Sequence, residues 1–589
     1  MGNEYFYSLK PMQYSVIFIL IVELFERFAF YGIYYTQTLF LTGAYNEDWN
    51  AGFTSVKAAS FVSMSTMVAY TTPFIGAFVS DSLFGDYKSL MVGLLVFYIP
   101  GVSLILLTTI PNLLGDEFNE TLLTFGFLFL WPLGTGIVKS IVNVFGAKQY
   151  HPLLQSSFIE SYYVSFYTVI NVGALAGICI IPIVAQRSIF IAYLIPLCLL
   201  IIGGICFLSG TPRYIRTPPR QRRDNEQLFL CGGKDGRKPN PRKPKSTSLF
   251  DIFSICLLAV PFNVGYNQMP TTFIVQGSVM SKAFGFLDVA SLNSLDAISV
   301  LVFGSITANC IYPYLLKRGI KIPTTYKFAI GSVLGSVALA WAIVVDKMIH
   351  STFEQTGEQV NVLWQAPSYI LIGFGEIFTV STAYEVAFTA APPDKKVLAS
   401  ATNIFCVGGL PNMICIALIH FCRRWFTNSH GNENIGHVED YASAHVGKYF
   451  VVLLSIMMFG VFINVLPWVK EYVESIEERA SDLAKTPSNT PTSILRRRND
   501  EENSPLLLKI TPRTKKHRQY LKYGSGPIYS RTSSMRAGTS FSRKDGPDKI
   551  KKIQYKAISK LYGKEPKIRK IKVATGVDGQ PIKVGSFDM

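Results

Sequence analysis

Long apolar runs dominate this chain and limit what it can fold into. Of its 589 residues, 49% are hydrophobic, and these residues are gathered into twelve runs. A helix needs about 20 predominantly apolar residues to cross the hydrocarbon core of a bilayer. The runs cover residues 15–42, 53–80, 89–110, 121–146, 156–184, 188–209, 249–278, 289–316, 325–348, 362–391, 398–421 and 447–469. The sequence therefore predicts an all-α integral membrane protein with twelve transmembrane helices.

Two polar, basic segments divide the chain and predict its orientation. A bundle of six helices (1–210) is followed by a linker (211–248), a second six-helix bundle (249–469) and a tail (470–589). The linker has eleven Lys or Arg against three acidic residues, and the tail 27 against 13. Basic segments favour the cytoplasmic side, so we expect both termini to be cytoplasmic and the tail to be disordered. Two six-helix halves are typical of the major facilitator fold, which binds its solute between the halves near the middle of the bilayer.

Charged residues interrupt the apolar runs in both halves. Glu23, Glu26 and Arg27 share one face of the first span, where the opposite charges can pair. A charge at the bilayer centre costs at least roughly 2.5–3.5 kcal/mol, so this face must meet a polar cavity or a helix bundle. The group is either a structural ion pair or a proton or solute site. Lys139 and Glu385 lie in opposite halves and could clamp a zwitterion between them.

Other classes of function lack support in the sequence. We find no Ser-His-Asp set, no His or Cys cluster with metal spacing and no phosphate-binding loop, so we expect neither an enzyme nor a cofactor. No folded nucleic-acid module accompanies the basic tail. Its basic clusters could instead attract anionic lipid, and residues 502–507 fit an acidic dileucine signal for a sorting adaptor. Asn119 is in a glycosylation sequon on the predicted outer side.

Six stretches in register with the predicted spans resemble the proton-coupled oligopeptide transporters, the family that includes plant nitrate and peptide transporters. The stretches are ELFERFAFYG (23–32), YTTPFIGAFVSD (70–81), GTGIVK with FG (134–139, 145–146), FYTVINVG (166–173), QMPTTFIVQG (268–277), and GE, YE and AP (375–376, 384–385, 391–392). These motifs are most similar to those of plant-type members. The likeness spans roughly the first 470 residues, and the tail shows none.

The resemblance implies a site for peptides and protons between the halves. It implies that Glu23, Glu26 and Arg27 form a proton-linked network with Lys139, and that Glu385 faces the amino end of the peptide. It also implies pocket residues, each of which could instead be a helix-packing or core residue. These are Tyr31, Tyr70 and Asn171, with Gln268 and Asn293 as weaker candidates.

The chain departs from the family pattern at several charged positions. Tyr34 stands where many members have an arginine, which leaves the peptide carboxylate to Lys139. Asp86 stands where an arginine is usual, and Lys88 could substitute for it. Lys148 stands where an acidic residue is usual. Asp296 is an additional carboxylate, which is either a further proton site or a residue near the membrane edge.

The leading hypothesis is a proton-coupled symporter of di- and tripeptides that works by alternating access. Nitrate transport by the plant mechanism is not expected, because Tyr266 stands at the position of the nitrate-binding histidine. Two alternatives stay open: a proton-coupled carrier of another small organic solute, and a transporter-like sensor or scaffold that acts through its tail. Endosomal, lysosomal, vacuolar and plasma membranes all fit the sequence.

Overall fold

A computed structural model describes residues 3–151, 155–216, 247–320, 322–391, 396–485, 570–575 and 581–585. Most of the predicted linker and tail lies outside the described residues. The dileucine-like segment at 502–507 and the basic clusters at 496–498, 515–518 and 549–552 lie there as well.

The N-terminal half follows the six predicted spans. Its helices are α1 (Ile17–Leu41), α2 (Ser55–Thr71), α3 (Pro73–Val79), α4 (Asp86–Val92), α5 (Ile99–Thr108), α6 (Glu120–Phe125), α7 (Trp131–Ala147), α8 (Ser156–Ala185) and α9 (Ile189–Ser209). Short π-helical turns continue α1, α3, α4 and α6 at one end, so that several neighbouring pieces form one span. Three of these pieces have a proline in their first turn, where the missing N–H costs no hydrogen bond.

The C-terminal half is also helical but more often broken. Its helices are α10 (Leu249–Leu257), α11 (Val260–Tyr266), α12 (Thr272–Ser278), α13 (Val289–Leu292), α14 (Ser294–Ile306), α15 (Tyr312–Lys317), α16 (Thr324–Thr356), α17 (Ala366–Thr389), α18 (Lys396–Ile404), α19 (Leu410–Phe421), α20 (Val438–Ser443), α21 (Val446–Val465) and α22 (Pro467–Lys485). Helices α10 and α11 meet at a bend of 52°. A second break, between α11 and α12, contains Pro270.

The described residues contain most of the twelve predicted membrane-spanning helices. Among the described residues, ten helical stretches are long and apolar enough to cross a bilayer, and the bent pair α10–α11 makes an eleventh. Helix α1, with 25 residues, fills the place of the remaining predicted span and carries the three charges at its centre. The prediction of an all-α, multi-pass membrane protein is confirmed.

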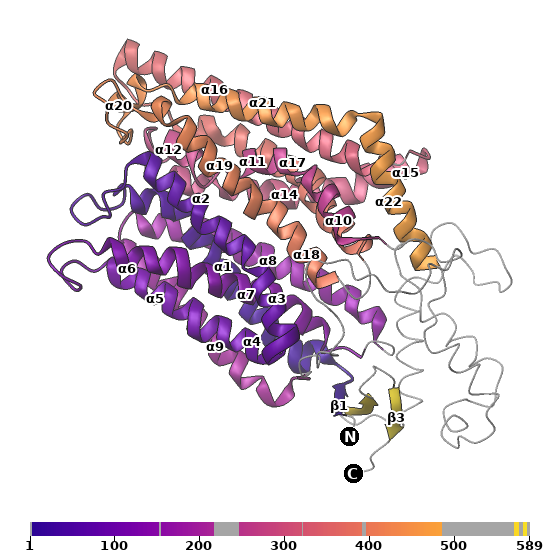
Figure 1. The fold of residues 1–589 in the computed structure, drawn as a ribbon. Coiled ribbons are helices and arrows are strands. Elements are labelled where there is room, and N and C mark those ends of the chain that lie inside the picture. Colours follow the sequence, from indigo (N-terminus) through magenta and orange to yellow (C-terminus); the bar gives the residue numbers. More distant parts are fainter. Residues whose placement is uncertain are drawn as a thin grey trace, which may run out of the picture.

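The two halves form two helical bundles that lie side by side (Figure 1). In the N-terminal half α1 packs on α8 and α9, and in the C-terminal half α16 packs on α17 and α21. Between the halves α2 contacts α19, α8 contacts α13 and α14, and α3 contacts α18. We call the side of the bundles where α9 ends and α10 begins the linker side.

Hydrogen bonds join the halves on the side opposite the linker. Four of them involve residues at the ends of helices or in the loops beyond. They run from Thr38 Oγ1 to the Pro270 carbonyl (2.6 Å), from Tyr45 O–H to Asp288 Oδ2 (3.3 Å), from Gln186 Nε2 to the Phe286 carbonyl (2.8 Å) and from Ile435 N–H to Ser55 Oγ (3.3 Å). The halves are therefore joined on the side opposite the linker.

Towards the linker-side end of α17, two tyrosines of opposite halves are exposed. Tyr167 on α8 and Tyr384 on α17 interact electrostatically across the two halves, yet they are 57% and 43% exposed. The halves also contact each other towards the linker side, where α3 meets α18.

Helical structure continues beyond the predicted end of the last span at residue 469. Helix α22 reaches Lys485 and buries Val469, Val473 and Ile476 against the C-terminal half. Three strands form an antiparallel sheet in the order β1 (Asn3–Ser8), β2 (Lys570–Thr575), β3 (Pro581–Gly585). Residues from both ends of the chain therefore pair on the linker side (Figure 1).

Candidate functional site

A buried ion-pair group lies in the middle of α1. Arg27 forms ion pairs with Glu23 (Nε to Oε1, 2.9 Å) and with Glu26. All three residues are at most 3% exposed. Thr135 on α7 donates a hydrogen bond to the other oxygen of Glu26 (2.8 Å). The structure therefore brings the three predicted proton-coupling residues of α1 into direct contact and ties them to α7.

Lys139 supplies the second cation of this region. It lies one helical turn after Thr135 on α7, and its ammonium interacts electrostatically with Glu23 and Glu26. The ammonium is 4.2 Å from the ring centre of Phe30 and 4.5 Å from that of Tyr70. Aromatic faces stabilise a cation without neutralising it. In the part of the chain that the structure describes, no carboxylate lies within ion-pair distance of Lys139, so its charge is available to an anionic group.

Two predicted pocket residues, Tyr31 and Tyr70, lie where the halves face each other. Tyr31 on α1 interacts electrostatically with Tyr70 on α2 and with Glu376 of the opposite half. Gly408, also in the C-terminal half, leaves room for the Tyr70 ring, because a Cβ there would lie 2.3 Å from it. Asn171 on α8 is half-buried, and its amide donates to the carbonyl of the exposed Tyr167 (2.8 Å). Tyr31 and Tyr70 therefore lie at the contact between the halves, and Asn171 lies next to the exposed Tyr167.

The two weaker candidates lie inside helix packing. Gln268 is fully buried, and its amide donates to the Val264 carbonyl (2.9 Å) and to Cys415 Sγ (3.1 Å). Its oxygen accepts hydrogen bonds from two hydroxyls, so its hydrogen-bonding groups are already occupied. Asn293 is also fully buried, at the start of α14. Gln268 therefore has no free hydrogen-bonding group for a solute, whereas the Oδ1 of Asn293 has no partner among the described residues.

Glu385 lies at the linker-side end of α17, four residues before the helix ends. Its carboxylate is 3.7 Å from the ammonium of Lys327 on α16, within its own half. The side chain is 58% exposed. The structure therefore does not bring Glu385 together with Lys139 and the α1 group.

Glu376, near the middle of α17, occupies the place that was predicted for Glu385. It interacts electrostatically with Tyr31 and Tyr70 of the opposite half and with Tyr384 of its own. Sequence reasoning missed it as a site residue, although it belongs to one of the matching motifs. The signal that could have found it is its depth, because an ionisable residue in the middle of a span is functional by default.

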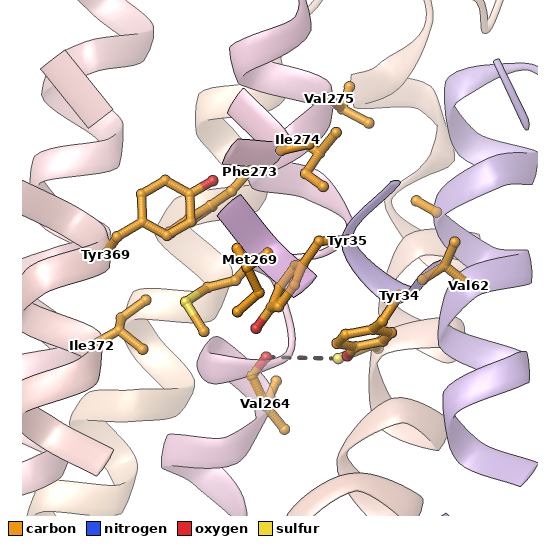
Figure 2. Close-up of a cluster of buried hydrophobic side chains, with 14 of the residues drawn as sticks. Tyr34, Tyr35, Val62, Val264, Met269, Phe273, Ile274, Val275, Tyr369 and Ile372 are labelled. Carbon is orange, nitrogen blue, oxygen red and sulfur yellow. Dashed lines mark hydrogen bonds between the residues drawn. The ribbon is translucent and has the colours of Figure 1, made fainter. Parts of the chain in front are cut away.

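Tyr34 stands where many members of the family have an arginine, and its ring packs against other aromatic rings. Tyr34 is 6% exposed and stacks on Phe30 at 5.5 Å between ring centres. Figure 2 shows Tyr34 and Tyr35 beside Val264 and Met269 of α11 and the following break. Here α1 joins the apolar core of the opposite half, so this position offers no charge to a peptide.

Two of the unusual charges compensate each other. Asp86 at the start of α4 forms an ion pair with Lys148 just after α7 (2.5 Å). It also accepts a hydrogen bond from Ser80 (2.5 Å). Lys88, which was expected to substitute for the missing arginine, is exposed. Lys88 therefore takes no part in this contact, and its role stays a prediction. Relative to the family pattern, the two charges are exchanged: the carboxylate is at position 86 and the cation is at position 148.

The arrangement can bind a solute that carries both signs of charge. The N-terminal half presents the ammonium of Lys139, and the C-terminal half presents the carboxyl of Glu376, with tyrosines between them. Among the described residues, no group of three or more His, Cys, Asp or Glu side chains could hold a metal ion.

Comparison with known proteins agrees with the fold and identifies a family. The model of the POT family matches residues 88–231 and 242–435. The peptide transporter PTR2 of Saccharomyces cerevisiae is 25% identical over 422 residues, which cover 64% of this chain and 69% of that protein. Protein NRT1/PTR family 8.1 of Arabidopsis thaliana is 24% identical over 540 residues, covering 77% and 92%.

Solved structures support the same fold. The crystal structure of the POT family transporter PepTSo aligns with a TM-score of 0.64 at 19% identity, covering 80% of this chain and 99% of that chain. A POT family transporter in complex with a thioalcohol-conjugated peptide aligns with a TM-score of 0.58 at 17% identity, covering 75% and 94%. The predicted two-bundle major facilitator fold is confirmed.

Proposed function

Because this chain belongs to the POT family, we propose that it is a symporter that moves di- and tripeptides across a membrane together with protons. It is an integral membrane transporter and not an enzyme. One observation carries the proposal for the solute: a cation and a carboxyl of opposite halves, Lys139 and Glu376, each lie beside the same tyrosine, Tyr70.

A short peptide matches this pair of charges. Its carboxylate would bind the ammonium of Lys139, which has no carboxylate partner among the described residues. Its ammonium would bind Glu376, which takes the role first expected of Glu385. Charge-assisted hydrogen bonds of this kind are about twice as strong as neutral ones. A solute with only one charge would leave either Lys139 or Glu376 unpaired, and this is costly at mid-depth.

Protons would be coupled to the solute through the group on α1. Glu23 and Glu26 both pair with the guanidinium of Arg27, and the ammonium of Lys139 interacts electrostatically with both glutamates. When one glutamate takes a proton, the attraction between the group and Lys139 weakens, and the ammonium is freer to bind the peptide carboxylate. When the proton leaves, Lys139 is attracted back and the peptide is released. The proton therefore favours peptide binding, which is the requirement for symport.

We infer that the structure represents one stage of an alternating-access cycle. We infer that the linker side is cytoplasmic, because the linker is strongly basic. The hydrogen bonds opposite the linker then hold the two halves together on the outer or lumenal side. An acidic exterior and an acidic lumen would drive transport in the same direction.

Uptake into proteoliposomes tests this function. The full-length protein is reconstituted, a pH gradient with an alkaline interior is imposed, and a labelled dipeptide is supplied, with nitrate and a free amino acid measured separately. We expect accumulation of the dipeptide that disappears when the gradient is collapsed. Accumulation of a different solute alone would contradict peptide transport. If no solute is taken up while the gradient persists, a sensor role would replace the transporter role.

Three variants test whether Glu376 or Glu385 is the carboxyl that binds the solute. We expect Lys139→Ala and Glu376→Gln to lower gradient-driven uptake by about tenfold or more, which corresponds to about 1.4 kcal/mol or more of lost binding. Glu385→Gln is the matched control on the same helix. If Glu385→Gln abolishes uptake and Glu376→Gln does not, the assignment made from the sequence is correct and the one made from the structure is wrong.

A further inference from the structure

A histidine on the side opposite the linker connects α16 to a loop of the same half. His350 lies in the last two turns of α16, which ends at Thr356. Its Nδ1 is 2.8 Å from the carbonyl oxygen of Asp346, and its Nε2 is 3.2 Å from that of Ala444, just before α21. The imidazole therefore joins α16 to the segment between α19 and α21 (residues 422–445), which we call the α19–α21 loop.

Both ring nitrogens of His350 face hydrogen-bond acceptors. A carbonyl oxygen can only accept a hydrogen bond, and a neutral imidazole has one N–H, whereas the imidazolium has two. Only the charged ring can therefore donate to the carbonyls of Asp346 and Ala444 at the same time. The neutral ring would turn the lone pair of one nitrogen towards an oxygen. The geometry thus favours the protonated form of His350.

The charges around His350 come from α16, α20 and the start of α21. A pocket between α16 and α21 is lined by His350 and by further charged or titratable groups. These are Asp346, Lys347 and Glu354 of α16 and His445 and Lys448 at the start of α21, and the ring of Tyr441 on α20 lies 5.9 Å from that of His350. Among the described residues, only the Asp346 carboxyl is within ion-pair distance of the imidazole, at 3.8 Å. The side chain of His350 is 24% exposed, so protons from the water on this side can reach it.

Asp346 attaches the same loop to α16 at two further points. The carboxyl is buried, and its Oδ1 accepts a hydrogen bond from the O–H of Tyr441 on α20 (2.7 Å). Its Oδ2 lies against the first turn of α21, where Gly447 leaves room for it, because a Cβ there would collide with this oxygen. A buried carboxylate needs a nearby positive charge, and the imidazolium of His350 supplies one. The two residues, one turn apart on α16, therefore hold the loop together.

The α19–α21 loop extends this attachment to the N-terminal half. The N–H of His445 donates to the carbonyl of Trp425 (2.9 Å), which joins the two ends of the loop. Ile435 in the middle of the loop is fully buried, and its N–H donates to Ser55 Oγ at the start of α2 (3.3 Å). The short 3₁₀ helix η9 (Arg423–Phe426) also contacts α2. A loop that is held less firmly on α16 is therefore also held less firmly on the opposite half.

We propose that His350 is a pH-sensitive latch on the side opposite the linker. As an imidazolium it holds the α19–α21 loop on α16, and the loop in turn holds α2 of the N-terminal half. When the ring loses its proton, it loses one of its two hydrogen bonds and its attraction to Asp346. Histidine exchanges its proton between about pH 5 and pH 8, so acid on this side favours the arrangement in which the halves are joined there. The latch does not depend on which solute is carried.

Hydrogen–deuterium exchange of the full-length protein tests the latch. Exchange is measured at about pH 5.5 and about pH 7.5, and each rate is corrected for the intrinsic effect of pH on amide exchange. We expect residues 426–447 and the first turn of α2 to exchange about tenfold more slowly at the lower pH, while the linker-side ends of the helices change little. Equal corrected rates in the wild type overturn the proposal, as does a change confined to the loop that leaves α2 unaffected. No solute is present, so the result is independent of the proposed peptide transport.

Three substitutions assign the pH effect to a residue. His350→Gln keeps an N–H donor but cannot be charged, so we expect fast exchange of the loop at both pH values. His350→Arg is charged at both, so we expect slow exchange at both. His437→Gln, which replaces an exposed histidine of the same loop, is the matched control and should keep the wild-type pH difference.

A pH difference that persists in His350→Gln or His350→Arg overturns the proposal, and so does its loss in His437→Gln. Protection of α16 and α21 outside the loop contact is compared in every variant, because a general loss of structure would lower it as well. If His350→Gln does not fold, the wild-type comparison and His350→Arg still decide between the outcomes.

Discussion

Asp288 is a buried carboxyl at the contact between the two halves. It caps α13, where it accepts hydrogen bonds from the N–H (2.9 Å) and the hydroxyl (2.7 Å) of Ser291, and it accepts another from Tyr45 of the opposite half. Burial raises the pKa of this carboxyl, against the hydrogen bonds from Ser291 that lower it. Ionisation of Asp288, on the side opposite the linker, is therefore costly.

Replacing Asp288 by Asn is predicted to change how stability depends on pH. A raised pKa in the folded protein means that the folded state binds the proton more tightly than the unfolded chain. The contribution of Asp288 is then present at acid pH and lost as the pH rises through its folded pKa. Asn is an equally good helix cap and does not titrate. We expect the apparent Tm of Asp288→Asn relative to wild type to rise by roughly 2 °C between about pH 4 and pH 7. A difference that is constant over this range would contradict the prediction.

The two glutamates of α17 show what could and could not be predicted for a residue. The sequence places Glu376 and Glu385 in one apolar span, and this is enough to predict that a carboxyl of this half is functional. They are nine residues apart, which at 3.6 residues per turn puts them on opposite faces of the helix. Only one of the two glutamates can therefore face the other half. Because the span is apolar on all its faces, its periodicity does not indicate which glutamate this is. The packing against α14 and α16 decides it.

At the scale of elements, the ion pair between Asp86 and Lys148 ties the start of α4 to the end of α7. The carboxyl of Asp86 is 6% exposed, so this contact is better shielded than an ordinary surface pair. Sequence reasoning recognised both residues as departures from the family pattern. It did not pair them, because they are 62 residues apart in the chain and only the fold brings them together.

Exchanging the two charges tests whether the ion pair acts as a unit. Asp86→Arg alone places two cations side by side, and Lys148→Glu alone places two carboxylates side by side. We expect each to lower the apparent Tm and dipeptide uptake, and we expect the double variant Asp86→Arg/Lys148→Glu to recover at least half of the loss. The coupling energy should be on the order of 1 kcal/mol. Lys88→Glu is the control and should have no effect. Additive losses in the double variant would show that the pair does not couple.

Breaks within the spans were not predictable from apolar length. The run at 249–278 looks like one helix in sequence, but the structure divides it into α10, α11 and α12. Proline lacks an N–H and disfavours a helical conformation for the residue before it, which accounts for the break at Pro270. The carbonyl of Pro270 is then free to accept the hydrogen bond from Thr38 of α1. The break therefore makes one of the contacts that close the side opposite the linker.

At the scale of the whole molecule, α22 connects the last span to the linker side of the C-terminal half. Thr324 at the start of α16 donates a hydrogen bond to Glu477 (2.5 Å), and Arg479 is 3.5 Å from Asp251 at the start of α10. Figure 1 shows α22 running from the end of α21 across this side of the bundle. The predicted boundary at 469 rested on composition, and α22 is polar enough on its outer face to resemble a tail.

Two truncations are predicted to differ sharply because of this helix. A chain that ends at Lys485 keeps α22 and should keep the wild-type apparent Tm and dipeptide uptake. A chain that ends at Leu466 loses three side chains that are at most 3% exposed, Val469, Val473 and Ile476. Full burial of such a side chain contributes about 1.5–3 kcal/mol, so we expect a loss of several kcal/mol in stability, measured as apparent Tm and as the fraction of monodisperse protein. If the chain ending at Lys485 is stable but no longer transports, residues beyond α22 are required for transport and the tail has a regulatory role. If it is unstable, the pairing of β2 and β3 with β1 contributes to the fold.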